Sequence, residues 1–349
     1  MEMTELLELS VNQHASDLHL LPGLPPTMRI DGDLIPAKGI PALPPEVTKR
    51  LIYSVMTKDQ QQAFETNLEM DLAVSYPKIG HFRVNVLHQL RGVAAVFRVI
   101  PEEVPTFEQL ELPQILKTLL VLHHGLVLIT GPTGSGKSTT QAAMIEYINR
   151  MRACNIITIE DPIEYIFQSK KSLINQRQVH RDTANVATAL RSALREDPDV
   201  ILLGELRDLE TIRLALTAAE TGHLVVATLH ASSTPAAVGR MVDVFPNEEK
   251  NRVRNLLADS LQAVICQTLV RKISGGRIGA FEIMLATPAI RHLIRADKMA
   301  HIIMTIQTNG DLGMCTLDQY LQTLVMKNII TSSVARSAAV NQDWFAGLI

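Results

Sequence analysis

Residues 131–138 read Gly131-Pro132-Thr133-Gly134-Ser135-Gly136-Lys137-Ser138 and match the phosphate-loop pattern G-x-x-x-x-G-K-[ST] in full. The apolar run 125–130 before them predicts a buried parallel strand, and the stretch 139–151 after them predicts a helix. Closely spaced glycines let backbone N–H groups converge on phosphate oxygens, and the helix N-terminus adds positive charge. Lys137 can then reach the β- and γ-phosphates, and Ser138 can ligate Mg²⁺. Residues 131–138, with Thr139 at the helix start, are therefore expected to bind a nucleoside triphosphate.

The composition predicts a cytoplasmic enzyme with room for two domains. The chain has 349 residues and a formal net charge of -3, which does not favour nucleic-acid binding. Glu2, Glu5 and Glu8 stand where a signal peptide needs basic and apolar residues, and no run of about 18 uncharged apolar residues follows. The three cysteines lie far apart, so neither a disulfide framework nor a cysteine-rich zinc site is expected.

The residue patterns divide the chain near position 100. Residues 1–100 alternate short strand-like runs with turn signals and predict an α+β domain. A short, polar, proline-stiffened linker is expected at 101–112, followed by an α/β domain at 113–349. Towards its end this domain is expected to become mainly helical, with helices at 248–270 and 288–306.

Three further segments predict polar groups at the carboxyl ends of strands, where open α/β sheets bind ligands. The strand 155–159 runs into carboxylates at 160–164, a suitable place for a water-activating group such as Glu164. The strand 199–203 leads to Glu205, which resembles a Mg²⁺-binding Walker B acid, although Gly204 occupies the usual aspartate position.

The strand 224–229 is bracketed by His223 and His230. These histidines are candidates to sense the γ-phosphate from a neighbouring strand end, while a structural role is the more usual one for such a pair. The absence of further ligands nearby in the sequence argues against zinc.

Residues 81–100 predict a β-hairpin whose turn lies at Leu90 and Arg91. This register puts Arg83 opposite Arg98, and opposed like charges are destabilising without an anion between them. Two readings remain open on these residues: the arginines bind a phosphate, or they extend into solvent from an exposed sheet face.

Several segments resemble the Walker A, Asp box, Walker B and His box of the type II/IV secretion ATPase superfamily; they are residues 131–140, 158–164, 194–199, 204–211 and 221–230. Within that superfamily the pilus retraction ATPases are the most similar group, on the evidence of residues 15–20, 190–198 and 289–295. The resemblance covers nearly the whole chain.

The resemblance implies a ring-shaped homo-hexamer whose subunits have a PAS-like amino-terminal domain and a RecA-like domain, with ATP and Mg²⁺ bound between them. Lys137 and Ser138 would hold phosphates and Mg²⁺, and Glu205 would be the Walker B acid, in contact with the ion partly through water. Glu164 would be the general base. His230 would match the His box, and His223 is a further candidate for it.

The resemblance also gives Arg83 and Arg98 a role, because they match paired amino-domain arginines that approach the phosphates in related ATPases. It implies a cytoplasmic protein at the cytoplasmic face of the inner membrane. Its expected partners are an inner-membrane pilus platform protein and pilin, with peripheral membrane association through the platform. Nucleic acid is not among the expected partners.

Retraction is favoured over pilus assembly or type II secretion because the chain starts close to its PAS-like domain and has no C-x-x-C pair. The retraction motif is altered, however, since His292 and Ala296 replace the family's asparagine and glutamate. The alternatives are an accessory retraction paralogue and a type IV secretion motor of the same superfamily. A nucleotide-gated adaptor without turnover is disfavoured by the presence of both Glu164 and Glu205, and a DNA-handling motor is disfavoured by the net charge of -3.

Overall fold

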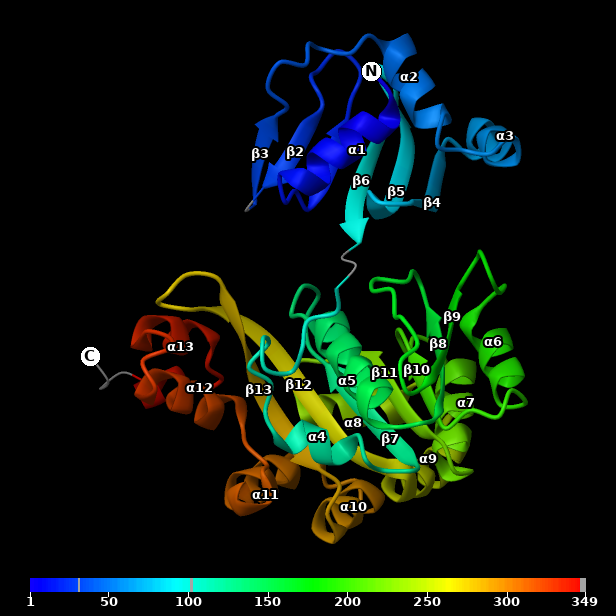
Figure 1. Cartoon of the computed structure of the whole chain (residues 1–349). Coiled ribbons are helices and arrows are strands. Elements are labelled where there is room, and N and C mark those ends of the chain that lie inside the picture. Colours follow the sequence, from blue (N-terminus) through cyan, green and yellow to red (C-terminus); the bar gives the residue numbers. More distant parts are fainter. Residues whose placement is uncertain (31, 101–102, 346–349) are drawn as a thin grey trace. The chain divides into compact units, whose positions relative to one another are not determined.

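The computed structural model describes residues 1–30, 32–100 and 103–345. The chain forms two compact units, one spanning Met1–Glu103 and the other beginning at Val104 (Figure 1). No helix among these residues is both long enough and apolar enough to cross a membrane.

The first unit is an antiparallel sheet with helices, as expected of an α+β domain. Its described strands pair in the order β3-β2-β1-β6-β5-β4, and every neighbouring pair is antiparallel. Along β5 the side chains of Phe82, Val84 and Val86 are buried and those between them are not, which is typical of a sheet with one face in the core. The elements are α1 (Met3–Asn12), β1 (Asp17–Leu20), β2 (Thr27–Ile30), β3 (Asp33–Pro36), α2 (Pro45–Tyr53), α3 (Lys58–Asn67), β4 (Glu69–Tyr76), β5 (Gly80–Gln89) and β6 (Gly92–Ile100).

The predicted hairpin is confirmed. β5 ends at Gln89 and β6 begins at Gly92, so the turn lies at Leu90 and Arg91, and Arg83 pairs with Arg98.

The second unit is built on a seven-stranded sheet in the order β13-β12-β7-β11-β10-β8-β9. Neighbouring strands are parallel except for the edge pair β12 and β13. The strands expected near 125–130, 155–159, 199–203 and 224–229 are confirmed, whereas β9 was not predicted. The strands are β7 (Gly125–Thr130), β8 (Asn155–Glu160), β9 (Leu173–Gln178), β10 (Val200–Leu203), β11 (Leu224–Leu229), β12 (Leu261–Arg271) and β13 (Arg277–Leu285).

Helices cover both faces of this sheet (Figure 1), which confirms the α/β, RecA-like fold class. Val127 and Ile129 of β7 pack against α4 and α5, and Leu126 and Leu128 face the core formed by α6 to α9. The helices are α4 (Ile115–Leu119), α5 (Lys137–Met151), α6 (Val186–Ala193), α7 (Leu209–Glu220), α8 (Thr234–Asp243) and α9 (Asn247–Ser260). The helical carboxyl-terminal region comprises α10 (Pro288–Arg295), α11 (Ile302–Thr308), α12 (Leu317–Met326), α13 (Ser332–Ala338) and the short 3₁₀ helices η1 (Met299–His301), η2 (Gly310–Leu312) and η3 (Gln342–Phe345).

Both helices expected near the carboxyl end are shorter than predicted. The expected helix 248–270 stops at Ser260, and Leu261 begins β12, which is parallel to β7. A short apolar run fits a buried strand as well as a buried helix, so its periodicity could not distinguish them. The expected helix 288–306 ends at Arg295 because Asp297 adopts a left-handed conformation with φ 57, and it resumes only at Ile302.

The expected linker 101–112 is also shorter than predicted. Residues 101 and 102 lie outside the described residues. Phe107 and Leu112 are buried in the core of the second unit, where they join Leu116 and Leu119 of α4. The segment from Val104 onward therefore packs as part of this unit.

Candidate active site

The phosphate loop connects the buried strand β7 to the start of α5. Gly131 has φ 143, and a Cβ atom there would lie 2.2 Å from the backbone oxygen of Gln267, so only glycine fits. Gly136 has φ 85 and caps α5, whose first residue is Lys137. This geometry leaves the first-turn N–H groups of α5 available to an anion, as the sequence pattern predicts.

Lys137 turns back onto the loop that precedes it. Its Nζ atom donates to the carbonyl oxygens of Gly131 and Pro132, each at 2.9 Å. Burial lowers the pKa of this ammonium group, and the carboxylates of Glu205 and Glu164 act against that change. Both glutamates therefore lie near enough to raise the pKa of Lys137. Side chains that follow the ends of β7, β8 and β10 thus come together.

Glu205 follows β10 and lies between a histidine and an arginine. Its Oε1 atom is 3.4 Å from His230 Nε2, and its Oε2 atom is 2.9 Å from Arg207 Nη2. Arg207 also lies 3.7 Å from an oxygen of Asp161, and the hydrogen bond that it donates to Glu205 raises its pKa. The sequence predicts no role for Arg207, because an arginine two residues after an acidic residue is not a specific motif.

Of the two histidines that bracket β11, only His230 is at the carboxyl edge. His223 lies before the strand, at its opposite end, where its Nδ1 atom is 2.9 Å from the carbonyl oxygen of Ala218. The expectation that both contribute to one site is wrong, and His223 has the structural role.

The Asp-box segment begins with a buried acid and continues with an exposed one. Glu160 ends β8 and is only 9% exposed, and burial raises the pKa of its carboxyl group to about 7. Glu164 is exposed on the loop that follows. The hydroxyl groups of Tyr165 on this loop and Thr139 at the start of α5 are 3.1 Å apart, which joins the Asp-box segment to the phosphate loop.

The residues around the loop fit a nucleoside triphosphate and Mg²⁺. Among the described residues, Ser135 has a buried hydroxyl group without a hydrogen-bond partner, inside the loop that is expected to cradle phosphates. The Ser138 hydroxyl group and the Glu205 carboxylate are hard oxygen donors of the kind that Mg²⁺ prefers. A pocket of ≈ 290 Å³ opens beside the loop, lined in part by Gly131, Pro132 and His230.

Arg83 and Arg98 belong to the first unit, and each has a carboxylate partner there. Arg98 Nε donates to Asp17 Oδ1 at 2.8 Å, and Arg83 Nη2 lies 4.0 Å from Asp71 Oδ1. The side chain of Asp17 is only 7% exposed, so Arg98 neutralises a buried charge. The opposed arginines therefore do not need a phosphate to offset their repulsion, and their proposed contact with one rests on the family resemblance alone.

The arginines of the altered retraction motif are docked rather than freely exposed. Arg291 Nη1 donates to the carbonyl oxygens of Ala258 and Asp259 at the end of α9, the second at 2.9 Å. Arg295 forms an ion pair with the Asp259 carboxylate. Ile290 and Ile294 are buried. These contacts fasten α10 to α9.

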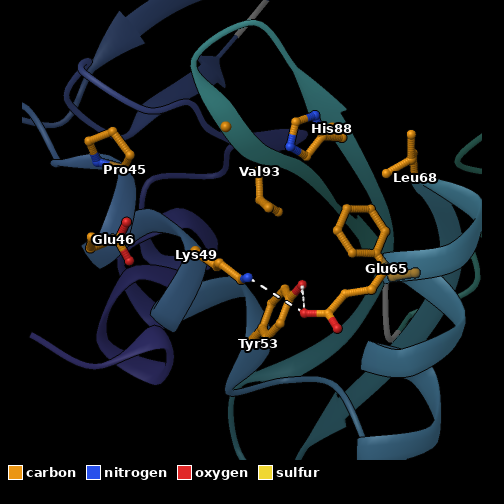
Figure 2. Close-up of a pocket in the computed structure, with 10 residues that line it drawn as sticks. Pro45, Glu46, Lys49, Tyr53, Glu65, Leu68, His88 and Val93 are labelled. Carbon is orange, nitrogen blue, oxygen red and sulfur yellow. Dashed lines mark hydrogen bonds and ion pairs between the residues drawn. The ribbon is translucent and has the colours of Figure 1, made fainter.

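A second hollow lies in the first unit, between α2, α3 and the β5–β6 hairpin (Figure 2). It measures ≈ 300 Å³. Glu65 accepts a hydrogen bond from the Tyr53 hydroxyl group at 3.2 Å and pairs with Lys49 Nζ at 3.6 Å. These contacts join α3 to α2, and none of the predicted site residues lines this hollow.

Comparison with known proteins gives concordant matches. The sequence profile of the Type II/IV secretion system protein family matches residues 3–275. The chain is 56% identical to the type IV pilus retraction ATPase PilT of Pseudomonas aeruginosa over 339 residues, which are 97% of this chain and 98% of the relative. It is 50% identical to the twitching motility protein of Neisseria gonorrhoeae over 319 residues, 91% of this chain and 85% of the relative. The crystal structure of the pilus retraction motor PilT with bound ADP superposes with a TM-score of 0.93 at 45% identity, over 99% of this chain and 98% of that one.

Proposed function

The chain belongs to the Type II/IV secretion system protein family, and we propose that it is an ATP-driven motor that retracts type IV pili and so supports twitching motility. One observation carries the proposal. Lys137, Glu205, Glu164 and His230 converge at one edge of a parallel sheet, in a chain that matches a pilus retraction ATPase over nearly its full length.

The proposed chemistry is hydrolysis of ATP by an attacking water. Lys137 and the backbone N–H groups of residues 131 and 133–139 bind the phosphates, while Ser138 and Glu205 would hold Mg²⁺, Glu205 partly through water. The ion supplies positive charge against the negative charge that spreads over the transferring phosphoryl group. Glu164 orients the water and accepts its proton. His230, held beside Glu205, contacts the γ-phosphate.

Mechanical coupling is proposed to run through the first unit, which the family resemblance describes as PAS-like. Arg83 and Arg98 contact the phosphates while ATP is bound and release them after hydrolysis, which couples the chemistry to motion of the first unit. Six subunits form a ring at the cytoplasmic face of the inner membrane. The ring acts through a platform protein to return pilin to the membrane.

The chemistry is tested by ATP binding and steady-state hydrolysis of two variants. Lys137→Ala is expected to abolish turnover and weaken binding, because it removes the phosphate-binding charge. Glu164→Gln is expected to retain ATP while turnover falls about a hundredfold or more, the usual consequence of losing a general base. Glu220→Gln, which changes an exposed glutamate at the end of α7, is the matched control and keeps parental turnover. Parental hydrolysis by Glu164→Gln would refute the base assignment and make Glu205 the next candidate.

A further inference from the structure

The proposed base, Glu164, lies on a segment without regular secondary structure. Residues 161–172 connect β8 to β9 and contain neither helix nor strand. A general base must keep its carboxylate within hydrogen-bond reach of the water that it activates, and misplacement by about 1 Å costs up to about a hundredfold in rate. Some other part of the molecule must therefore fix this loop.

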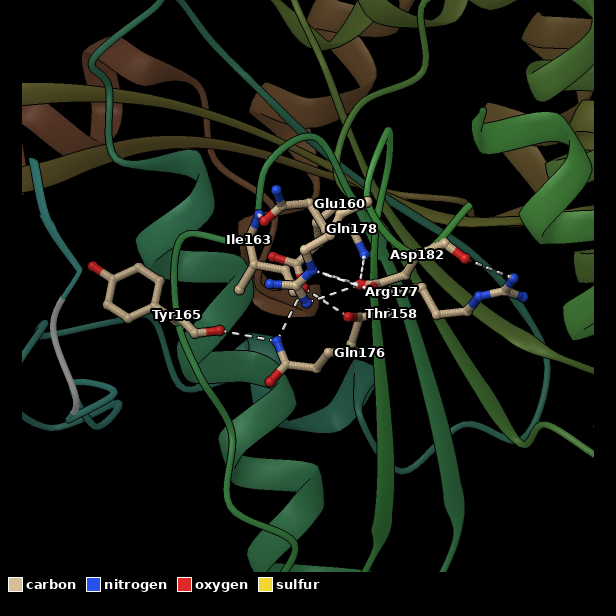
Figure 3. Close-up of polar contacts among 9 residues, drawn as sticks. Thr158, Glu160, Ile163, Tyr165, Gln176, Arg177, Gln178 and Asp182 are labelled. Carbon is tan, nitrogen blue, oxygen red and sulfur yellow. Dashed lines mark hydrogen bonds and ion pairs between the residues drawn. The ribbon is translucent and has the colours of Figure 1, made fainter. Parts of the chain in front are cut away.

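Gln176 of β9 makes three hydrogen bonds around the loop, and Figure 3 shows those to Tyr165 and Glu160. Its Nε2 atom donates to the carbonyl oxygen of Tyr165 at 2.9 Å and to Glu160 Oε1 at 3.2 Å. Its Oε1 atom accepts from the backbone N–H of Phe167 at 2.8 Å. The Gln176 side chain thus links loop residues 165 and 167 to the buried carboxyl group of Glu160 at the end of β8.

Glu160 is the other fixed point of this arrangement. The Thr158 hydroxyl group donates to Glu160 Oε1 at 2.6 Å, so this buried oxygen accepts from two side chains. The backbone of Glu164 lowers the pKa of this carboxyl group and so opposes the effect of burial. Glu160 therefore lies close to the main chain of the residue whose carboxylate is proposed to activate water.

Gln178, two residues along β9, completes the pattern. Its Oε1 atom accepts from the backbone N–H of Ile163 at 3.3 Å. The loop is thereby held at residues 163, 165 and 167, and the side chains of Ile163 and Phe167 are buried while Glu164 is exposed. The anchors lie on both sides of Glu164 and leave its carboxylate directed away from the core.

We propose that Gln176, with the buried carboxyl group of Glu160, is a positioning unit that fixes the Asp-box loop and so aims Glu164 at the attacking water. The inference rests on the proposed role of Glu164. Neither Gln176 nor Glu160 is assigned a contact with ATP, and both act through Glu164. A purely structural role would stabilise the protein without any dependence on Glu164.

The test is a double-mutant cycle on steady-state ATP hydrolysis. Gln176→Met keeps the length of the side chain and removes all three hydrogen bonds. In the parental background it is expected to lower kcat about tenfold or more while KM for ATP changes by less than about twofold, because phosphate binding is untouched. In the Glu164→Gln background it is expected to cause no further loss, because there is no base left to position.

Asn175→Leu is the matched control. The Nδ2 atom of this exposed residue on the same strand donates to Asn155 Oδ1 at 3.5 Å, outside the Asp-box segment, so the variant is expected to leave kcat unchanged in both backgrounds. If Gln176→Met does not fold, Gln178→Met removes only the contact with Ile163 and is expected to give a smaller loss with the same dependence on Glu164.

Each outcome decides the inference. Unchanged kcat in the parental background, or an equal loss with and without Glu164, would overturn it. If Glu164→Gln alone hydrolyses ATP at the parental rate, the proposed base is wrong, which is a separate failure visible before the cycle is completed.

Discussion

At the residue scale, the site depends on which carboxyl groups are buried and which are exposed. Glu160 and Glu164 are four residues apart, yet one is buried at a strand end and the other is exposed on a loop. Burial disfavours the charged form of a carboxyl group, and the nearby charge of Glu164 adds to this effect, so the pKa of Glu160 rises to about 7. The donors Thr158 and Gln176 act in the opposite direction without cancelling it. Glu160 is therefore suited to a structural hydrogen bond, and Glu164 to exchange with water.

This burial predicts a specific pH dependence of stability. Between about pH 4.5 and pH 7 the unfolded chain has an ionised Glu160 and the folded chain a protonated one, so the folded state binds the additional proton. The resulting stabilisation is fully present below about pH 4.5 and is lost as the pH rises through about 7, a change of roughly 3 kcal/mol. Glu160→Gln should remove this pH-dependent stabilisation. The free energy of unfolding of the variant minus that of the parent should therefore be more positive at pH 8 than at pH 5.

Urea denaturation at the two pH values measures this difference. Glu220→Gln, which changes an exposed side chain, should show the same difference in free energy of unfolding from the parent at both pH values. A pH-independent difference for Glu160→Gln would contradict the burial argument.

At the element scale, the site forms because parallel strands end at the same level. Ile159 of β8 pairs with Leu203 of β10, and Leu203 with Ala227 of β11, so the residues that follow these strands meet at one edge. The backbone packs closely here, since a Cβ atom on Gly204 would lie 3.3 Å from the Cα atom of Glu160. An aspartate at 204 would require this contact to shift, so glycine fits here more easily than the aspartate that is usual at this position.

The contact between α9 and α10 supplies an element-scale prediction. Arg291 satisfies carbonyl groups at the end of α9 and places a positive charge at the negative end of that helix. Arg291→Ala should lower the free energy of unfolding by about 1 to 2 kcal/mol, allowing for the partial exposure of the guanidinium group. His292→Ala, at an exposed position on the same helix, should change it by less than about 0.5 kcal/mol.

Chemical denaturation of both variants checks this. If Arg291→Ala is as stable as the parent, Arg291 does not anchor α10. A role in retraction would then be the remaining interpretation of this residue.

The sequence predicted those elements and residues whose signals are local. The phosphate loop, the strands before Glu160 and Glu205, and the register of Arg83 with Arg98 each follow from short patterns. Gln176 could not be found this way, because β9 is rich in polar residues and its importance comes from pairing with β8. Arg207 was missed for a similar reason, since its partners Glu205 and Asp161 come from two different strand ends.

At the scale of the whole molecule, the two units have different sheets and different shares of the proposed mechanism. The first has an antiparallel sheet that carries Arg83 and Arg98, and the second has a mainly parallel sheet that carries the phosphate loop and its acids. If Arg83 and Arg98 contact the phosphates as proposed, hydrolysis in the second unit changes what the first unit can bind. We propose that this division of roles is the source of mechanical work. The central claim is that the protein performs this work on a pilus.

Counting surface pili on a strain that lacks this protein tests that claim most directly. We expect this strain to have excess, immobile pili and no twitching, because pili are still assembled but are not withdrawn. Expression of the parental chain or of Glu220→Gln should restore normal pilus numbers and twitching, and expression of Glu164→Gln should not. Absence of surface pili from the deletion strain would identify an assembly motor instead, and normal pili with normal twitching would contradict a role in retraction altogether.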